Sequence, residues 1–75
     1  MKNNELHNAF KEFISKAKEK GYRQEHIKTL GMFALTKKAV EHFGSSLVAF
    51  EHLITLVDKY EEDDVIKLYI EELKI

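Results

Sequence analysis

The sequence predicts an all-α fold, a small bundle of four to five short helices in one domain, residues 1–75. The chain contains no proline and only three glycines, so it has few residues that break helices. Apolar residues make up 44% of the chain and charged residues 33%, which is the balance of a folded protein rather than a disordered one. A length of 75 residues allows a single hydrophobic core.

The first helix is predicted at about 4–19. Its apolar residues fall on one arc of roughly 140°, opposite lysines and glutamates, which is the pattern of an amphipathic helix. Asn3 or Asn4 is expected to cap the start of the helix, and Gly21 to take the left-handed conformation after its end. The apolar arc contains Leu6, Ala9, Phe10, Phe13, Ile14 and Ala17.

Residues 23–43 change their apolar face partway along. They form either one central helix that packs its two parts on different neighbours, or two helices at about 23–31 and 36–43. We favour two helices, because Gly31 weakens a helix by about 1 kcal/mol relative to alanine and Thr36 is an acceptable N-cap. The first face contains Ile27, Leu30, Phe33 and Ala34, and the second, rotated by roughly 150–180°, contains Met32, Leu35, Ala39, Val40 and Phe43.

The last two helices are predicted at about 46–60 and 63–74. Ser45 or Ser46 caps the first of them, whose apolar stripe covers half its circumference. So broad a stripe is typical of a helix that packs against at least two others. The acidic run at 61–64 is expected to cap the second helix and to place carboxylates at its positive N-terminus. Leu68 and Ile75 lie outside the apolar arc of this helix.

Composition narrows the function classes. The absence of cysteine excludes disulfides, cysteine-ligated metals and thiol chemistry. The chain has no glycine-rich phosphate loop or nucleophile motif, and a bundle of this size leaves little room around a substrate, so we expect neither an enzyme nor a cofactor. There is no apolar signal segment and no run near the roughly 18 apolar residues of a membrane span, which predicts a cytoplasmic protein without membrane contact.

Charge is divided unevenly along the chain. Residues 1–38 hold nine Lys and Arg against four Glu, a net +5, whereas residues 39–75 hold three Lys against nine Asp and Glu, a net −6. The two halves either fold against each other and neutralise in part, or leave a basic end free for phosphate or for a second copy. Tyr22 is a nearby aromatic able to stack on a base. The predicted contacts to phosphate or to an acidic partner are Lys16, Lys20, Arg23, Lys28, Lys37 and Lys38.

Residues 36–53 have the layout of a helix-turn-helix, a motif that reads DNA in many regulators. Gly44 is the turn glycine, Ser46 caps the second helix, and the inward positions are apolar. The outward positions, however, are apolar or acidic, where DNA favours cations and amides. The inward positions are Ala39, Phe43, Phe50 and Leu53, and the outward ones are Leu47, Val48, Glu51 and His52.

The segment KKAVEHFGSSLVAFE (37–51) is similar to the second hairpin of helix-hairpin-helix domains, in which an HFGS-type turn joins two short helices. The resemblance implies a five-helix arrangement. It also implies a first hairpin in which the backbone amides of a Gly-hydrophobic-Gly turn hold a DNA phosphate. Here that stretch reads Gly31-Met32-Phe33, so the second glycine is absent and Phe33 blocks the close backbone approach.

The four histidines, at 7, 26, 42 and 52, lack the spacing that places two metal ligands on one helix face. His42 and His52 flank the turn at 44–46, where they form either a metal pair, a pH-sensitive contact or ordinary exposed positions. The run EEDD (61–64) lacks the glycine and the bidentate glutamate of a calcium loop. We therefore expect no metal site.

Apolar residues beyond those that the core needs favour contact with another protein. We expect a small regulator, inhibitor or adaptor that binds a protein, either a different one or a second copy of itself. The alternative is a small DNA-binding regulator that uses Lys37, Lys38 and the basic residues of 16–28. The predicted partner-binding residues are Leu47, Val48, Leu68 and Ile75, and Met32 is a further apolar residue off the core stripes.

Overall fold

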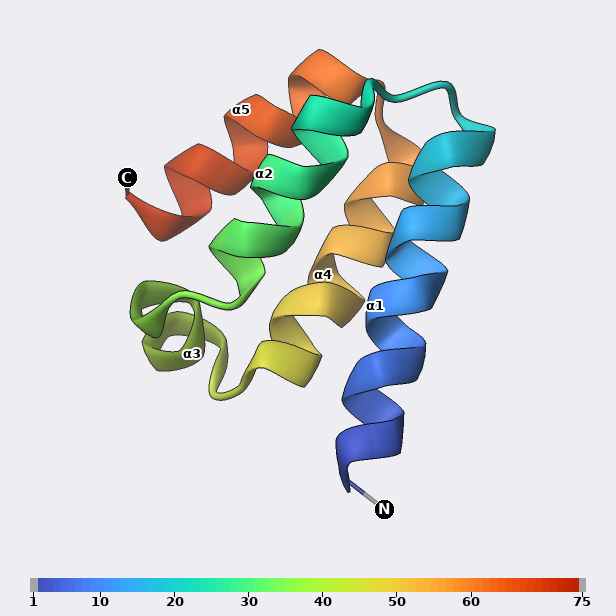
Figure 1. Ribbon diagram of the computed structural model, residues 1–75. Coiled ribbons are helices and arrows are strands. Elements are labelled where there is room, and N and C mark those ends of the chain that lie inside the picture. Colours follow the sequence, from blue (N-terminus) through green and yellow to red (C-terminus); the bar gives the residue numbers. More distant parts are fainter. Residues whose placement is uncertain (1, 75) are drawn as a thin grey trace.

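The computed structural model describes the backbone of residues 2–74 and the side chains of residues 4–74, and it confirms the all-α prediction (Figure 1). No strand occurs in this part of the chain. The five helices are α1 (Lys2–Glu19), α2 (Gln24–Ala34), α3 (Lys37–Phe43), α4 (Ser46–Lys59) and α5 (Glu62–Leu73).

The turn between α1 and α2 is the one that Gly21 predicts. Gly21 has φ +82°, in the left-handed region, and its N–H donates to the Lys18 carbonyl at 3.0 Å. The Tyr22 N–H donates to the Ala17 carbonyl, also at 3.0 Å, which completes a Schellman motif. The start of α1 differs from the prediction, because the helix begins at Lys2 and residues 3 and 4 lie within its first turn rather than at the N-cap.

The segment 23–43 forms two helices, as favoured from its sequence. Thr36 has extended backbone angles, and its hydroxyl accepts a hydrogen bond from the Ala39 N–H at 3.2 Å, so it caps α3. The break lies after Ala34 rather than at 31, so Gly31 is inside α2. The cost of a helical glycine did not end the helix, because tertiary packing outweighs about 1 kcal/mol of propensity.

The other two turns depend on short caps. Gly44 has φ +96° and ends α3, and the Ser45 hydroxyl accepts from the Val48 N–H at 3.2 Å and so caps α4. For the acidic run at 61–64, the predicted carboxylates at the start of α5 are confirmed, but the predicted side-chain cap is not. Glu61 occupies the N-cap position without a side-chain cap bond, whereas the first turn does contain three carboxylates, those of Glu62, Asp63 and Asp64.

Helix α4 is the centre of the core. It packs against all four other helices, and most extensively against α1, as the broad apolar stripe predicted. In Figure 1, α4 passes behind the opening between α1 and α2, while α5 lies on the far side of α2. The largest fully buried side chains come from α1, α2, α4 and α5, and they are Phe13, Leu30, Phe50, Leu53, Val57, Val65 and Tyr69.

The unequal charges of the two halves partly neutralise each other in the fold. Lys16 Nζ lies 3.1 Å from Asp58 Oδ1, and Arg23 Nε lies 3.5 Å from Glu62 Oε2, so each pair joins the basic half to the acidic half. His26 also hydrogen-bonds to Glu62 through Nδ1. The Lys16–Asp58 pair is open to solvent, which screens its charges, so its contribution to stability is small. These pairs account for part of the charge division as ordinary surface pairing.

Candidate functional site

A concave surface lies between α1 and α2. It has a cavity volume of about 370 Å³. Most of its walls are apolar, with a few polar groups at the edge, which is the character of a binding site in a protein of this size. The residues that line it are Phe10, Ile14, Lys18, Gln24, Ile27, Lys28, Gly31, Met32 and Leu35.

A second hollow, also of about 370 Å³, continues the first toward the N-terminal end of α1. It is lined by Leu6, His7, Phe10, Leu35 and Phe50. Because Phe10 and Leu35 border both hollows, the two form one surface, which we name the α1–α2 groove. The rings of Phe10 and Phe50 meet edge to face with centroids 5.5 Å apart, so α4 supplies the floor at this end.

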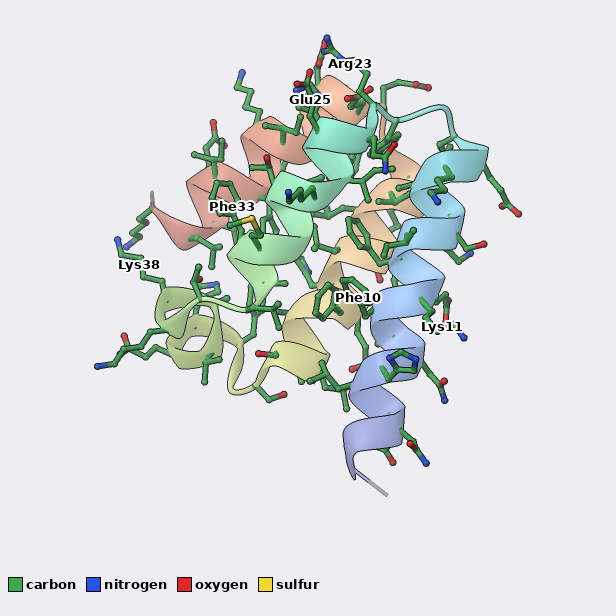
Figure 2. All side chains as sticks on the ribbon, viewed as in Figure 1. Phe10, Lys11, Arg23, Glu25, Phe33 and Lys38 are labelled. Carbon is green, nitrogen blue, oxygen red and sulfur yellow. The ribbon has the colours of Figure 1, made fainter. Side chains whose placement is uncertain are left out.

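The groove exists because α1 and α2 each pack on α4 more than on each other. Figure 1 shows the two helices joined at the turn of residues 20–23 and diverging away from it. Figure 2 shows Phe10 in the space between them and Lys11 on the opposite side of α1, facing away from the groove. The same amphipathic stripe that anchors α1 to the core therefore also supplies one wall of the groove.

Two large apolar side chains stand exposed at the edge of the groove. Met32 is 59% exposed and Leu35 is 55% exposed, more than the other exposed large apolar residues of the described chain. Met32 belongs to the apolar residues that lie off the core stripes, and both belong to the rotated face of 23–43. Contiguous exposed apolar surface with polar residues around it is typical of an interaction site.

Lysines border one end of the groove, beside the turn that joins α1 and α2. Lys18 comes from α1 and Lys28 from α2, and both are exposed. Among the side chains of residues 4–74, neither lysine has a carboxylate within 4.0 Å. The opposite end, formed by Leu6, His7 and Phe50, is mostly apolar. The groove is thus apolar along its length and positively charged at one end.

The six predicted basic contacts do not form one patch. Lys16 and Arg23 are held in ion pairs, and the Lys38 ammonium donates to the Lys74 carbonyl at 3.4 Å. Lys20 and Lys37 are exposed away from the groove, and Lys28 alone of the six borders it. Whether any of them contacts phosphate stays a prediction.

Tyr22 is not available to stack on a base, so that prediction is wrong. The side chain is only 6% exposed, and its hydroxyl donates to the Tyr60 carbonyl at 2.9 Å. Burial, together with the charges of Glu61, Glu62 and Asp64, raises the pKa of Tyr22 to about 12. The residue is a structural anchor for the turn after α1.

The predicted partner-binding residues are spread over two helices. Val48 is 41% exposed on α4, whereas Leu47 and Leu68 are half-buried and pack against the core. Ile75 lies outside the described residues. Leu47 borders a separate hollow between α1 and α4, so Leu47 and Val48 stay alternative contact residues away from the α1–α2 groove.

His42 and His52 take part in local packing and pairing. His42 Nε2 lies 2.8 Å from Glu72 Oε1, and the rings of His42 and His52 have centroids 4.7 and 5.0 Å from that of Phe43. Within the described chain, no group of three or more His, Asp or Glu side chains is placed to hold a metal ion.

Glu62 joins α5 to the start of α2. Its Oε2 accepts from the Arg23 backbone N–H at 3.2 Å and also hydrogen-bonds to His26. Burial acts to raise the pKa of Glu62, but the His26 and Arg23 hydrogen bonds and charges outweigh it and hold the pKa below the ordinary 4.5. A carboxylate at the N-terminus of α2 is also favoured by the helix dipole.

The α3–α4 pair keeps the inward packing of a helix-turn-helix. Ala39, Phe50 and Leu53 are buried and Phe43 is half-buried. Residues 31–33 lie within α2, so they form no turn that presents backbone amides to a phosphate. DNA binding by residues 36–53 stays a prediction.

No family model matches this chain, and no curated protein or solved structure matches it either. Within residues 2–74, no helix is both long enough and apolar enough to cross a membrane.

Proposed function

We propose that this protein is a non-enzymatic, cytoplasmic protein-interaction domain, and that the α1–α2 groove is its binding surface. One observation carries the proposal: an apolar groove runs along two helices and is bordered by exposed Met32 and Leu35. A regulator, inhibitor or adaptor acts through a surface of this kind.

The chemistry of the groove favours a protein partner over DNA. Methionine and aromatic side chains are enriched in protein interfaces, and Phe10 and Met32 contribute to this surface. DNA binding instead needs many cations that face the same way. Lys16 and Arg23, which lie in the basic half, already pair with Asp58 and Glu62.

A display library of random linear peptides tests the proposal directly. Peptides selected on the wild-type protein are then assayed on Met32→Glu, which places a charge at the groove edge. Val48→Glu is the matched control, because it places the same charge on an exposed apolar position of α4. We expect the selected peptides to lose at least tenfold in affinity on Met32→Glu, since burying an unpaired carboxylate costs more than about 1.4 kcal/mol.

The opposite pattern, loss on Val48→Glu alone, would move the binding surface to α4 and contradict the groove. A library that yields no binder would also contradict it. A parallel titration with duplex DNA at low salt separates the alternative function. Tight binding that weakens steeply with added salt would favour a DNA-binding regulator.

A further inference from the structure

We infer, on the basis of the proposed function, that the partner segment is an amphipathic α-helix with an acidic end, and that this end lies at Lys18 and Lys28. The occupant is thus defined by its helical shape and by the negative charge at one end. Three features of the groove support this inference: the spacing of the wall residues, the length of the groove and the position of the lysines.

The residues that line the groove follow the i, i+4 spacing of the side-chain ridges against which another helix packs. On α1 the wall is one i, i+4 row, and on α2 it consists of two such rows. Helices pack by fitting the i±4 ridges of one into the grooves of the other. The row on α1 is Leu6, Phe10, Ile14 and Lys18. The first row on α2 is Gln24, Lys28 and Met32, and the second is Ile27, Gly31 and Leu35, of which Leu35 lies just after the helix.

The length and the backbone chemistry of the groove also favour a helix. From Leu6 to Lys18 the α1 wall extends about 18 Å at 1.5 Å per residue, which matches about three turns of a bound helix. A peptide bound as a β-strand gains its affinity from backbone hydrogen bonds to a sheet edge. The walls are α-helices whose backbone groups bond internally, so they supply side-chain contacts only. A helix satisfies its own backbone and needs nothing else.

Gly31 lies in the floor of the groove. A Cβ at this position would meet Phe13 at 3.7 Å and Phe10 at 3.8 Å, which are ordinary contacts. The isolated fold therefore does not need a glycine here, although glycine costs a helix interior about 1 kcal/mol relative to alanine. The missing Cβ faces these two rings of α1, so the glycine lets α1 and α2 lie close together at this point of the groove.

The lysines give the bound helix a direction. Lys18 and Lys28 lie at the end of the groove near the α1–α2 turn, and the other end is apolar. Each offers an ammonium group to a carboxylate at one end of the occupant. Glutamates in the first turn of a partner helix fit this arrangement, since they also stabilise that helix through its dipole.

Fluorescently labelled helical peptides of about 14 residues test the inference by anisotropy at low salt. All share one apolar stripe, and the first turn holds two glutamates, two glutamines or two lysines. A proline-interrupted form of the glutamate peptide removes helicity. We expect the glutamate peptide to bind about three- to tenfold more tightly than the glutamine peptide, as two exposed ion pairs allow. The lysine peptide is expected to bind more weakly still.

Two double variants separate local charge from net charge. In Lys18→Glu/Lys28→Glu the preference is expected to reverse, so that the lysine peptide binds best. The control, Lys11→Glu/Lys67→Glu, changes the net charge equally at exposed positions outside the groove and is expected to keep the original preference. Equal affinity of the three helical peptides, or reversal in the control, would overturn the acidic end.

Failure of this inference is distinct from failure of the proposed function. If library peptides bind through Met32 and none of the designed helices does, the groove binds a protein segment that is not helical. If the proline-interrupted peptide binds as tightly as its parent, the helical occupant is likewise overturned. If neither library peptides nor designed helices bind, the proposed function itself fails.

Discussion

The hydroxyl of Tyr22 donates a hydrogen bond to the backbone carbonyl of Tyr60, 2.9 Å away. The bond joins the turn after α1 to the end of α4, although 38 positions separate the two residues. Because it holds the turn at one end of the α1–α2 groove, it contributes both to stability and to the position of the groove walls.

We expect Tyr22→Phe to lower the free energy of unfolding by about 1 kcal/mol, since it removes a hydrogen bond and leaves the Tyr60 carbonyl without its donor. Tyr69→Phe is the matched comparison. The Tyr69 hydroxyl is fully buried and has no hydrogen-bond partner among the described residues, so its removal is expected to leave stability unchanged or raise it. Urea denaturation of both variants measures the difference, and equal losses would contradict the assignment.

Stability is expected to fall in alkaline solution because of the same two tyrosines. Burial raises the pKa of Tyr22 from 10.0 to about 12, and burial also raises the pKa of Tyr69. Between the ordinary pKa and the raised pKa of Tyr22, the folded state binds more protons than the unfolded state. The contribution of Tyr22 to folding stability is therefore complete below pH 10 and is lost as pH rises toward 12. Unfolding curves across this range should show a smaller decline for Tyr22→Phe than for the wild type.

In acid, protonation of Glu62 is expected to cause part of the loss of folding stability. Its folded pKa lies below 4.5, so its contribution is complete above that pH and is lost as pH falls through the folded value. Glu62→Gln should lower stability at neutral pH and flatten the curve below pH 4.5. Glu71→Gln, at an exposed position of the same helix, is the control and should leave the acid slope unchanged.

Gly31→Ala is expected to stabilise the protein by about 0.5–1 kcal/mol, because the added methyl group has ordinary contacts and alanine favours the helix. Gly44→Ala should have the opposite effect and cost about 1–2 kcal/mol, since Gly44 has φ +96°. Thermal unfolding measures both. A loss of stability in Gly31→Ala would show that the fold needs this glycine where α2 packs on Phe10 and Phe13.

The helices were predictable from sequence because their ends depend on neighbouring residues. Gly21, Thr36, Gly44 and Ser45 each act within a few positions of themselves, and each stands where its chemistry suggested. The start of α1 was misplaced because the helix extends to Lys2, so Asn3 and Asn4 lie in its first turn and not before it. Gly31 was misplaced as a break because propensity is a weak effect inside a packed helix.

The groove was only partly predictable. The rotated apolar face that includes Met32 and Leu35 was visible in the sequence, and Met32 was expected to lie off the core. That this face would stand beside Phe10 and Ile14 depends on how α1 and α2 diverge over α4, which no local pattern encodes. The burial of Tyr22 likewise depends on a distant carbonyl, so a base-stacking role could not be excluded from sequence.

The central position of α4 also bears on how the chain folds during synthesis. Helices α1, α2 and α3 precede α4 in the chain, and α1 makes its most extensive contacts with α4. Until Phe50, Leu53 and Val57 have left the ribosome, α1 lacks the helix against which it packs most extensively. Folding is therefore expected to wait for about four-fifths of the chain and then to proceed in one cooperative step.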